Sequence, residues 1–355
     1  MKYLVVIACL LCLFGCSSKD DSYMPVSNFT DDSKPISYGN HQDVYVFFNQ
    51  ALNANTYEIM TEQFGYPQSG AQKERTFYLF WKDFADFEEL KKAKNIMFIC
   101  NLEVRDELTS FVEQKISQAK LDHVNNISSI ILTYQNEWSD DQLVTFILSK
   151  DERRTEDIIL AKIPNLYLDY AKRFLTRMTH RVYYRGTLSG NAFAEYKYGL
   201  EIPNTFQLYK EDKVENMISF LHRYKKKETV LPDKFITTYQ EKMESYDFND
   251  IWVKNIRERI GKVILDGDRI DWDRTKILSK TFTAWDGGIY YGYEIEGAWE
   301  NSNTNMGGSF RSYAFYDDNS KSGYFIDTAV YFPAGTKIPF IVELQGIAKS
   351  FYIKE

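Results

Sequence analysis

The strongest constraint on the fold is an alternation of residue types in residues 290–300. Apolar and aromatic residues occupy alternate positions, namely Tyr291, Tyr293, Ile295 and Trp299. Glutamates lie between and after them, namely Glu294, Glu296 and Glu300. Successive side chains of a β-strand point to opposite faces, so this period of two predicts a strand with one face in the core and one in water. A sheet with one solvated face is typical of antiparallel structure.

The neighbouring segments extend this strand to a β-meander. Residues 286–288 (Asp-Gly-Gly) and 317–319 (Asp-Asp-Asn) have the composition of turns, and residues 324–332 predict a returning strand. A closing helix is predicted from Pro339. Its apolar residues are Phe340, Leu344, Ile347 and Phe351. The C-terminal part is therefore predicted to be an antiparallel sheet covered by a terminal helix.

Residues 43–160 alternate between short apolar runs and helical stretches, as in an α/β or α+β domain. The segments predicted as strands are 44–48, 77–81, 96–100, 130–134 and 143–148. The segments predicted as helices are 51–63 and 102–119. Ser149 and Glu152 have the spacing of a capping box, which predicts a further helix that runs toward Pro164.

The middle of the chain, residues 164–265, is predicted to be helical. Asp233 is placed to cap a long helix in this region. The stripe of this helix would carry Phe235, Tyr239, Met243 and Tyr246. The expected fold class is α+β, with an N-terminal α/β-like half of short strands and helices, a helical middle, and a C-terminal antiparallel β-meander covered by a terminal helix.

The first residues have the pattern of a lipoprotein signal peptide. Lys2 precedes an almost wholly apolar run of roughly a dozen residues, which is too short to span a membrane. The run ends in Leu13-Phe14-Gly15-Cys16, which resembles the bacterial lipobox. The resemblance implies that Cys16 is lipidated and that its acyl chains anchor the mature protein in a membrane. An ordinary signal peptide with an accidental cysteine is the alternative.

The residues after Cys16 indicate the destination. Ser17 stands where an Asp would signal retention in the inner membrane, so an outer-membrane location is expected. The stretch Ser17-Ser18-Lys19-Asp20-Asp21 resembles the lipoprotein export signal of Bacteroidetes-type bacteria, which would place the body outside the cell. The alternative explanation is that these residues are simply a solvated polar tether.

These patterns divide the chain into four parts. Residues 1–15 are the predicted signal peptide, and residues 16–40, rich in Ser, Asp and Pro, are a predicted flexible acylated tether. Residues 41–185 are the predicted N-terminal α/β subdomain. Residues 186–355 are the predicted C-terminal α+β subdomain, which contains the antiparallel sheet.

Composition limits the partners and the chemistry. A formal net charge of −7 and a pI near 5.4 argue against a nucleic-acid partner, whose phosphates require a basic face. Cys100 is the one cysteine outside the signal region, and its position at the end of an apolar run predicts a buried thiol. The four histidines have no metal-ligand spacing, and we find neither a phosphate-binding loop nor a nucleophile elbow. No catalytic residue and no cofactor is predicted.

One block of the C-terminal part has a more specific pattern. Gly297-Ala298-Trp299, Asn303 and Met306-Gly307-Gly308-Ser309-Phe310, followed by aromatic strands and a closing helix, resemble the lipoprotein family known as domain of unknown function 4837. Further similar segments are 95–100, 138–148 with the helix at Asp151, and Leu200-Glu201-Ile202-Pro203. The resemblance extends over about residues 43–350. It implies a Bacteroidetes-type envelope lipoprotein and no particular activity.

Two groups of residues are candidates for binding a partner. Aromatic residues make up 16% of the chain, and an exposed platform would consist of Tyr183, Tyr184, Tyr196, Tyr198, Tyr290 and Tyr313. The alternative is that they fill the core. The second candidate is a recognition loop around two glycines, with Trp299, Met306, Gly307, Gly308 and Phe310. A tight connection with positive φ would also explain the glycines.

A weak metal candidate lies between these regions. Four carboxylates occur within eight residues, namely Asp266, Asp268, Asp271 and Asp273. They would suit a hard cation such as calcium, but Ile270 stands where an EF-hand loop has an oxygen ligand. A solvated connection is the favoured interpretation.

Two functions of different class follow. The first is a lipid-anchored, non-enzymatic lipoprotein of the outer membrane, surface-exposed or periplasmic, that binds a protein or glycan partner. The second is an envelope hydrolase for glycan or peptide, which predicts a deep pocket with two converging carboxylates of perturbed pKa. A third hypothesis is that the protein is a purely structural spacer.

Overall fold

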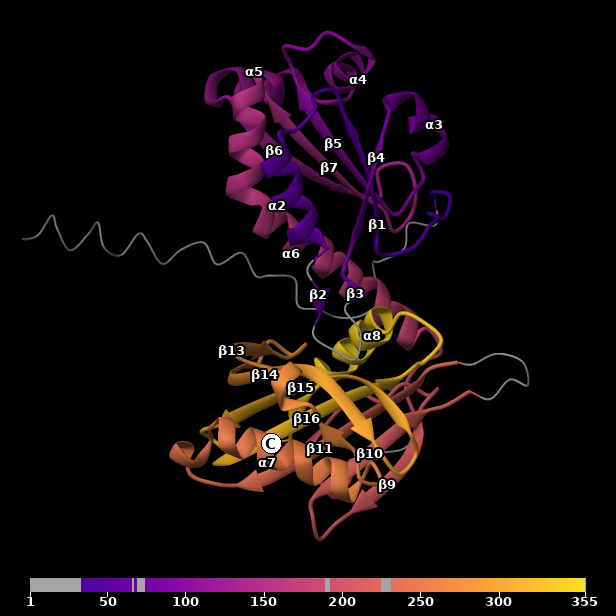
Figure 1. Cartoon of the computed structure of the whole chain (residues 1–355), viewed down its shortest axis with the longest axis vertical. Coiled ribbons are helices and arrows are strands. Elements are labelled where there is room, and N and C mark those ends of the chain that lie inside the picture. Colours follow the sequence, from indigo (N-terminus) through magenta and orange to yellow (C-terminus); the bar gives the residue numbers. More distant parts are fainter. Residues whose placement is uncertain (1–32, 66, 69–73, 189–191, 225–230, 355) are drawn as a thin grey trace, which may run out of the picture.

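The computed structural model describes residues 33–65, 67–68, 74–188, 192–224 and 231–354. They form two halves joined at a narrow waist (Figure 1). The predicted lipidation site Cys16 and the predicted export signal, residues 17–21, lie outside the described residues. In the part of the chain that is described, no helix is both long and apolar enough to cross a membrane.

The N-terminal half is built on a five-stranded sheet of order β4-β1-β5-β7-β6. Its strands are β1 (Asp43–Phe48), β4 (Tyr78–Lys82), β5 (Asn95–Asn101), β6 (Ser129–Gln135) and β7 (Leu143–Ser149). Neighbouring strands are parallel except for β6, which is antiparallel to β7. Every residue of β5 and β7 is buried, as expected for central strands covered on both faces. The predicted strands of this half are confirmed.

Helices cover both faces of this sheet. One face carries α3 (Phe87–Leu90), α4 (Glu107–Lys115) and α5 (Gln118–Ile127), and the other carries α2 (Ala54–Phe64) and α6 (Glu152–Tyr183) (Figure 1). The single helix predicted at 102–119 was wrong. Asp106 caps α4 by accepting from Thr109 N, and the chain becomes extended at Ile116 before α5 begins.

The helix α6 differs from its prediction at both ends. Its N-cap is Asp151, whose side chain accepts from Arg154 N, and Ser149 is the last residue of β7. The helix also continues through Pro164 to Tyr183. Proline costs a helix about 3 kcal/mol, but residues on both sides of Pro164 are buried. They include Ile159, Ile163, Leu166 and Tyr170. Tertiary packing therefore maintains the helix.

The C-terminal half is built on an antiparallel eight-stranded sheet of order β12-β14-β15-β16-β11-β10-β9, with β13 also paired to β14. Its strands are β9 (Gln207–Asp212), β10 (Met217–His222), β11 (Asp233–Lys242), β12 (Arg269–Ile270), β13 (Lys276–Thr283), β14 (Ile289–Asn301), β15 (Met306–Asp317) and β16 (Ser322–Tyr331). One face carries α7 (Asp250–Val263) and the other α8 (Ile338–Ala348). Short strands β8 (Tyr198–Gly199) and β17 (Tyr352–Ile353) pair beside them, and β2 (Pro67–Gln68) pairs with β3 (Glu74–Arg75) in the waist.

The α+β class, the antiparallel C-terminal sheet and its terminal helix are confirmed. The predicted helical middle, residues 164–265, was wrong for residues 198–242, whose regular elements are the strands β8 to β11. The helix predicted to begin at Asp233 is the strand β11, which pairs with β16 over its whole length. Residues spaced by four, such as Phe235 and Tyr239, share a face in a strand as well as in a helix. The β-branched residues between them favour the strand.

The end of the predicted tether belongs to the folded body. Asp140 N donates to Pro35 O, and Tyr38 exchanges backbone hydrogen bonds with residues 92 and 94. Residues 35–38 were predicted to be flexible as part of residues 16–40. Their pairing means that the body begins before the first sheet strand.

The waist is packed rather than open. Ile338 and Val342 of α8 share an apolar cluster with Phe174 and Met178 of α6. The carboxylate of Glu74 from the N-terminal half accepts from the backbone N–H groups of Lys337 and Ile338, at 2.7 and 3.1 Å. A carboxylate at a helix N-terminus is favourable because it satisfies free N–H groups and interacts with the helix dipole. The two halves are therefore held together by both apolar and polar contacts.

Candidate functional site

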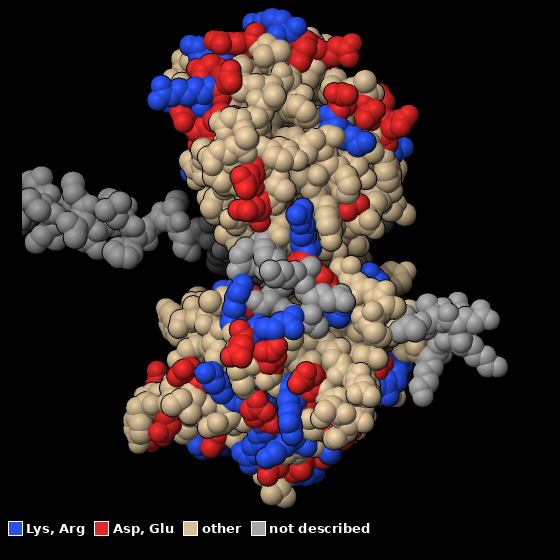
Figure 2. Space-filling view, viewed as in Figure 1, with Lys and Arg blue, Asp and Glu red and all other residues tan. Residues whose placement is uncertain are grey.

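A cleft of about 620 Å³ lies between the two halves. The wall formed by α6 is mainly apolar and consists of Pro164, Tyr167, Leu168, Ala171, Phe174 and Leu175. The opposite side, from β13 to β15 and the end of α8, is mainly charged and includes Lys280, Glu294, Glu296, Arg311 and Lys349. Figure 2 shows the contrast at larger scale: charged side chains crowd the waist and the C-terminal half, whereas the adjoining face of the N-terminal half is mostly uncharged.

The β14–β15 hairpin positions the charged side chains of the cleft. Asn301 pairs with Met306 across its turn, so the residues five positions away on either side, Glu296 and Arg311, lie opposite each other. Glu294 is two residues from Glu296 and shares its face of the sheet. The neighbouring strand β13 adds Lys280 to this face.

Arg311 and Glu296 form a buried ion pair in the cleft. Arg311 Nη2 donates to Glu296 Oε2 at 2.9 Å, and Nη1 donates to Gln345 Oε1 of α8 at 3.3 Å. Burial opposes the charged form of Arg311, but the neighbouring Tyr313, Glu294 and Glu296 outweigh it and raise the pKa of the guanidinium. Arg311 is therefore charged at neutral pH.

A second pair lies closer to solvent. Lys280 Nζ donates to Glu294 Oε1 at 2.6 Å. Burial would raise the pKa of Glu294, but Arg311 and Lys280 outweigh that effect and hold the pKa below its usual value. Lys349 also acts on Glu294, and its own Nζ donates to Thr283 O at 3.1 Å. Glu294 is thus a carboxylate at neutral pH.

The cleft therefore contains two neighbouring carboxylates, as the hydrolase hypothesis requires. A general acid needs a raised pKa so that it holds a proton near neutral pH. Glu294 has the opposite shift, and both Glu294 and Glu296 are engaged by cations. This arrangement suits binding of a charged ligand better than acid–base catalysis.

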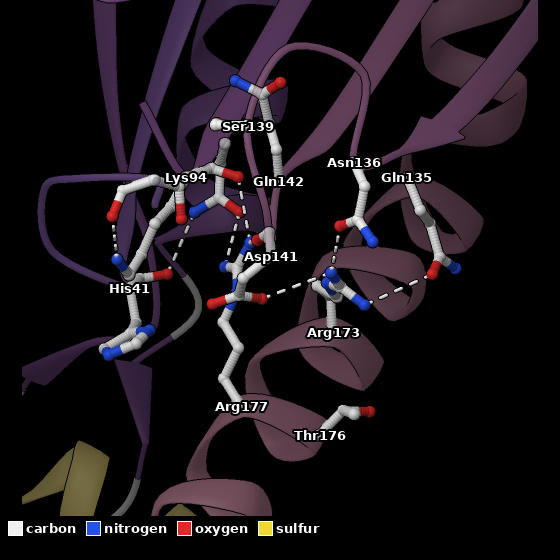
Figure 3. A network of polar contacts seen from close by, with 12 residues as sticks. His41, Lys94, Gln135, Asn136, Ser139, Asp141, Gln142, Arg173, Thr176 and Arg177 are labelled. Carbon is white, nitrogen blue, oxygen red and sulfur yellow. Dashed lines mark hydrogen bonds and ion pairs between the residues drawn. The ribbon is translucent and has the colours of Figure 1, made fainter. Parts of the chain in front are cut away.

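A separate polar network fastens α6 to the first sheet (Figure 3). Arg177 is 2% exposed and donates to Asn95 Oδ1, to the backbone oxygens of Lys94 and Asp141, and to Asp141 Oδ1, at 2.7 to 2.9 Å. Arg173 extends the network to Gln135 at the end of β6 and to Asn136 in the loop that follows. With its donors used inside the fold, Arg177 has a structural role.

Two further titratable groups are unsuited to catalysis. Burial first, and then the nearby cations Arg177, Lys94 and Arg181, lower the pKa of His41 to about 3, so this side chain is neutral at pH 7. Burial raises the pKa of the Cys100 thiol to about 12. Cys100 is fully buried on β5, which confirms the prediction of an inert buried thiol.

The predicted recognition loop is part of the core. Trp299 and Phe310 are 4% and 1% exposed and pack beneath α7, and Met306, Gly307 and Gly308 begin strand β15. A Cβ on Gly308 would lie 2.0 Å from Val330 O and 2.8 Å from Trp299 Nε1. Neither Gly307 nor Gly308 has a positive φ. The tight-connection alternative was therefore also wrong, since Gly308 is required by the close approach of Trp299 and β16.

The predicted tyrosine platform does not form. Tyr183, Tyr198 and Tyr313 are buried, and Tyr196 and Tyr290 pack against the same apolar cluster. Tyr184 is exposed, but the other five members belong to the core beneath α8. The core alternative is the correct one for these residues.

The acidic residues 266–273 serve separate structural purposes. Asp271 caps the turn at Arg274, Asp268 accepts from Asn301 Nδ2 at 2.8 Å, and Asp266 accepts from the Tyr209 hydroxyl at 3.2 Å. Among the residues that the structure describes, no three His, Cys, Asp or Glu side chains are grouped so as to hold a metal ion. The weak metal candidate of Asp266, Asp268, Asp271 and Asp273 is therefore not supported.

The cleft residues Lys280, Arg311 and Lys349 were missed from the sequence. Glu294 and Glu296 were noticed but assigned to a water-facing side, and Glu296 is 5% exposed. One available signal was the equal spacing of Glu296 and Arg311 from the turn at residues 302–305. Opposite charges at mirrored positions of a hairpin are favourable cross-strand partners.

Comparison with known proteins supports the resemblance found in the C-terminal half. The family model for a domain of unknown function, DUF4837, matches residues 190–350, which include the Trp299 to Phe310 block and most of the charged side of the cleft. The similar segments before residue 190 lie outside this match. No curated protein matches the chain.

Similarity to solved structures is weak. The Ran-binding protein Mog1p of Saccharomyces cerevisiae has 11% sequence identity over 45% of this chain and 92% of that chain, with a TM-score of 0.30. A mutant of the protein Mog1 has 10% identity over 45% and 92% of the two chains, with a TM-score of 0.29. A Bacteroides thetaiotaomicron protein has 8% identity over 45% and 46%, with a TM-score of 0.25. These TM-scores are too low to support a shared fold.

Proposed function

We propose that this protein is a lipid-anchored lipoprotein of the outer membrane that binds a protein or glycan partner in the cleft between its two halves. The main support for a binding function is the cleft, in which an apolar face of the helix α6 lies opposite a charged face of the sheet. Pockets that combine apolar lining with a few placed polar groups are typical binding sites.

The anchoring part of the proposal rests on the sequence. The lipobox-like Leu13-Phe14-Gly15-Cys16 supports acylation at Cys16, and residues 17–21 support export to the cell surface. Acyl chains contribute about 0.8 kcal/mol per buried methylene, so several chains make the anchor effectively permanent. A partner at the same surface would meet the cleft without free diffusion in three dimensions.

A matched pair of variants tests binding in the cleft. Leu168 and Leu160 are both exposed on α6, but only Leu168 lines the cleft. The full-length protein in detergent is screened against arrays of oligosaccharides and short peptides. We expect at least one bound probe whose affinity falls about tenfold in Leu168→Gln and is unchanged in Leu160→Gln. Absence of any bound probe, or equal effects of the two substitutions, would contradict binding in this cleft.

Intact cells test the location. Proteinase K is added to cells that express the wild type or a variant with Lys19, Asp20 and Asp21 all changed to Ala. Digestion of the wild type and protection of the variant are expected for a surface lipoprotein. Protection of both, in cells that degrade the protein after lysis, would instead place the body in the periplasm.

The two carboxylates in the cleft keep the hydrolase as a second candidate. To decide between binding and hydrolysis, the probe that binds is incubated with the protein and analysed by mass spectrometry. Cleavage that is lost in both Glu294→Gln and Glu296→Gln would replace the binding function by hydrolysis. An intact probe is the expected outcome, because cations engage both carboxylates.

A further inference from the structure

We propose that the ligand of the cleft is an extended acidic peptide segment of a partner protein, which pairs with the free edge of β13 and places a carboxylate beside Lys280 and Lys349. This inference rests on the proposed function, because it names the class of ligand for the same site. The inference goes beyond the proposed function because it chooses a peptide over a glycan and states how the peptide is bound.

The strand β13 has the properties of an accepting edge. Within the described residues it pairs with β14 alone, and most of its residues are exposed. An edge strand presents a row of unpaired N–H and C=O groups, which is where an extended peptide can add as a further strand. Leu278 and Lys280 of β13 also line the cleft, so an added strand would lie at its mouth.

The charge of the cleft fits an acidic ligand. The described lining residues include four cationic side chains, Lys172, Lys280, Arg311 and Lys349, and two carboxylates, Glu294 and Glu296. The four cationic and two carboxylate side chains give this lining a formal charge of +2, which is partly screened because Lys172 acts on Asp169 outside the lining and Lys349 acts on Glu294. Positive charge is therefore in excess where water is partly excluded. Because alternate side chains of an added strand face the cleft, acidic residues at every second position would meet this charge.

The lining favours a peptide over a sugar. Sugar sites present flat aromatic faces for stacking, but Phe174 is 1% exposed, which leaves Tyr167 as the one ring on the α6 wall with a partly exposed side chain. The remaining wall of Pro164, Leu168, Ala171 and Leu175 suits an apolar side chain. Gln63, Thr76 and Gln345 add polar groups that can meet peptide amides.

The test uses a labelled short peptide of alternating Glu and Thr, with its Gln and Thr counterpart as the uncharged probe. Fluorescence anisotropy with the full-length protein in detergent measures both affinities. We expect the Glu peptide to bind at least about tenfold more tightly than the Gln peptide, and this difference to shrink as salt is added. Equal binding of the two peptides would overturn the acidic part of the proposal.

Variants on the two faces of the sheet test the position of the peptide. Lys280→Gln is expected to weaken the Glu peptide about tenfold, whereas Lys262→Gln, the same change at an exposed position of α7 on the other face of the sheet, alters the affinity less than about twofold. Equal losses in both variants would mean attraction by general charge and would overturn the site. Circular dichroism confirms that each variant is folded.

Backbone methylation tests the strand pairing. Two peptides are compared, one with N-methyl groups on its odd-numbered residues and one with them on its even-numbered residues. Each peptide loses the hydrogen-bond donors along one edge only. The peptide methylated along the edge that faces β13 should not bind, and the other should bind as the unmodified peptide does. Tolerance of both sets would overturn pairing with β13. If oligosaccharides bind with the dependence on Leu168 described above and no acidic peptide does, the proposed function stands and this inference fails.

Discussion

Two arginine–carboxylate pairs lie on opposite faces of the same C-terminal sheet. On the α7 face, Arg257 Nε lies 2.8 Å from Asp327 Oδ1, and the two side chains are 0% and 1% exposed. On the α8 face, Arg311 Nη2 lies 2.9 Å from Glu296 Oε2, and their side chains are 9% and 6% exposed. The two pairs have similar N···O distances and differ in what surrounds them.

The α7-face pair is sealed. Arg257 lies over the ring of Phe310 at 4.7 Å, and Asp327 accepts a further hydrogen bond from Ser312 at 2.5 Å. The α8-face pair borders the cleft, where Lys280, Glu294 and Lys349 offer alternative partners. Within the described residues no guanidinium nitrogen of Arg257 has a hydrogen-bond partner, so this enclosed charge depends on its ion pair with Asp327. A pair at a cleft can instead exchange partners with a ligand. The difference teaches that the surroundings, rather than the pair, decide between a structural and a binding role.

The largest expected effect follows from breaking the sealed pair. Asp327→Ala leaves the charge of Arg257 buried without its partner, and such changes cost about 3–5 kcal/mol. Urea denaturation of the purified protein should show this loss in the free energy of unfolding. Replacement of both members, Arg257→Met with Asp327→Leu, should recover much of it. A loss below about 1 kcal/mol in the single variant would mean that the pair is not sealed.

A smaller loss is expected at the close approach of Trp299. Gly308→Ala adds a methyl group that would lie 2.0 Å from Val330 O, so backbone or ring must move, at a cost of about 1–3 kcal/mol. Gly307→Ala is the control, because its nearest contact would be 3.1 Å. The same denaturation experiment compares them. Equal stability of the two variants would show that Gly308 is not required by packing.

The stability of the protein is also expected to depend on pH through a buried carboxyl group on the α7 face. Burial raises the pKa of Asp268 from its usual 3.8 to about 6, although Asn301 and Arg257 oppose the shift. Between these values the folded protein holds a proton that the unfolded chain releases, so this group's contribution to stability falls as pH rises from about 4 to about 6. Asp268→Asn should remove that fall and raise the melting temperature at pH 7. An unchanged pH profile in calorimetry would contradict the assignment.

The smallest effect is expected at the cleft. The Lys280 side chain is 48% exposed, although that of its partner Glu294 is only 13% exposed. Arg311 and Lys349 continue to act on Glu294 without Lys280. Lys280→Gln should therefore lower the free energy of unfolding by no more than about 1 kcal/mol. Combined with a loss of peptide binding, this result would separate binding from stability. A loss as large as that of Asp327→Ala would instead make the cleft charges structural.

Local patterns predicted many elements of the fold but few of the site residues. The alternation in β14, the turns that flank it and the start of α8 beside Pro339 were all readable, because each depends on neighbours in sequence. The strand β11 was mistaken for a helix because a spacing of four residues suits both. The burial of Glu296 was missed because it depends on the helix α8 and on the N-terminal half.

The sequence by itself determined the α+β class, the antiparallel C-terminal sheet, the lipoprotein-like start and the lone cysteine of the predicted folded body. These properties follow from the types of residues and from the spacing of apolar residues over short stretches of sequence. Only the tertiary structure decided that both faces of β14 are covered at residues 295–299 and that five of the six platform tyrosines belong to the core. It also decided that Lys280, Glu294 and Arg311 face an apolar helix across a cleft. The physical reason is that the cleft and its burial arise from segments about a hundred residues or more apart, such as α6 and β15, and no local pattern records which of them meet.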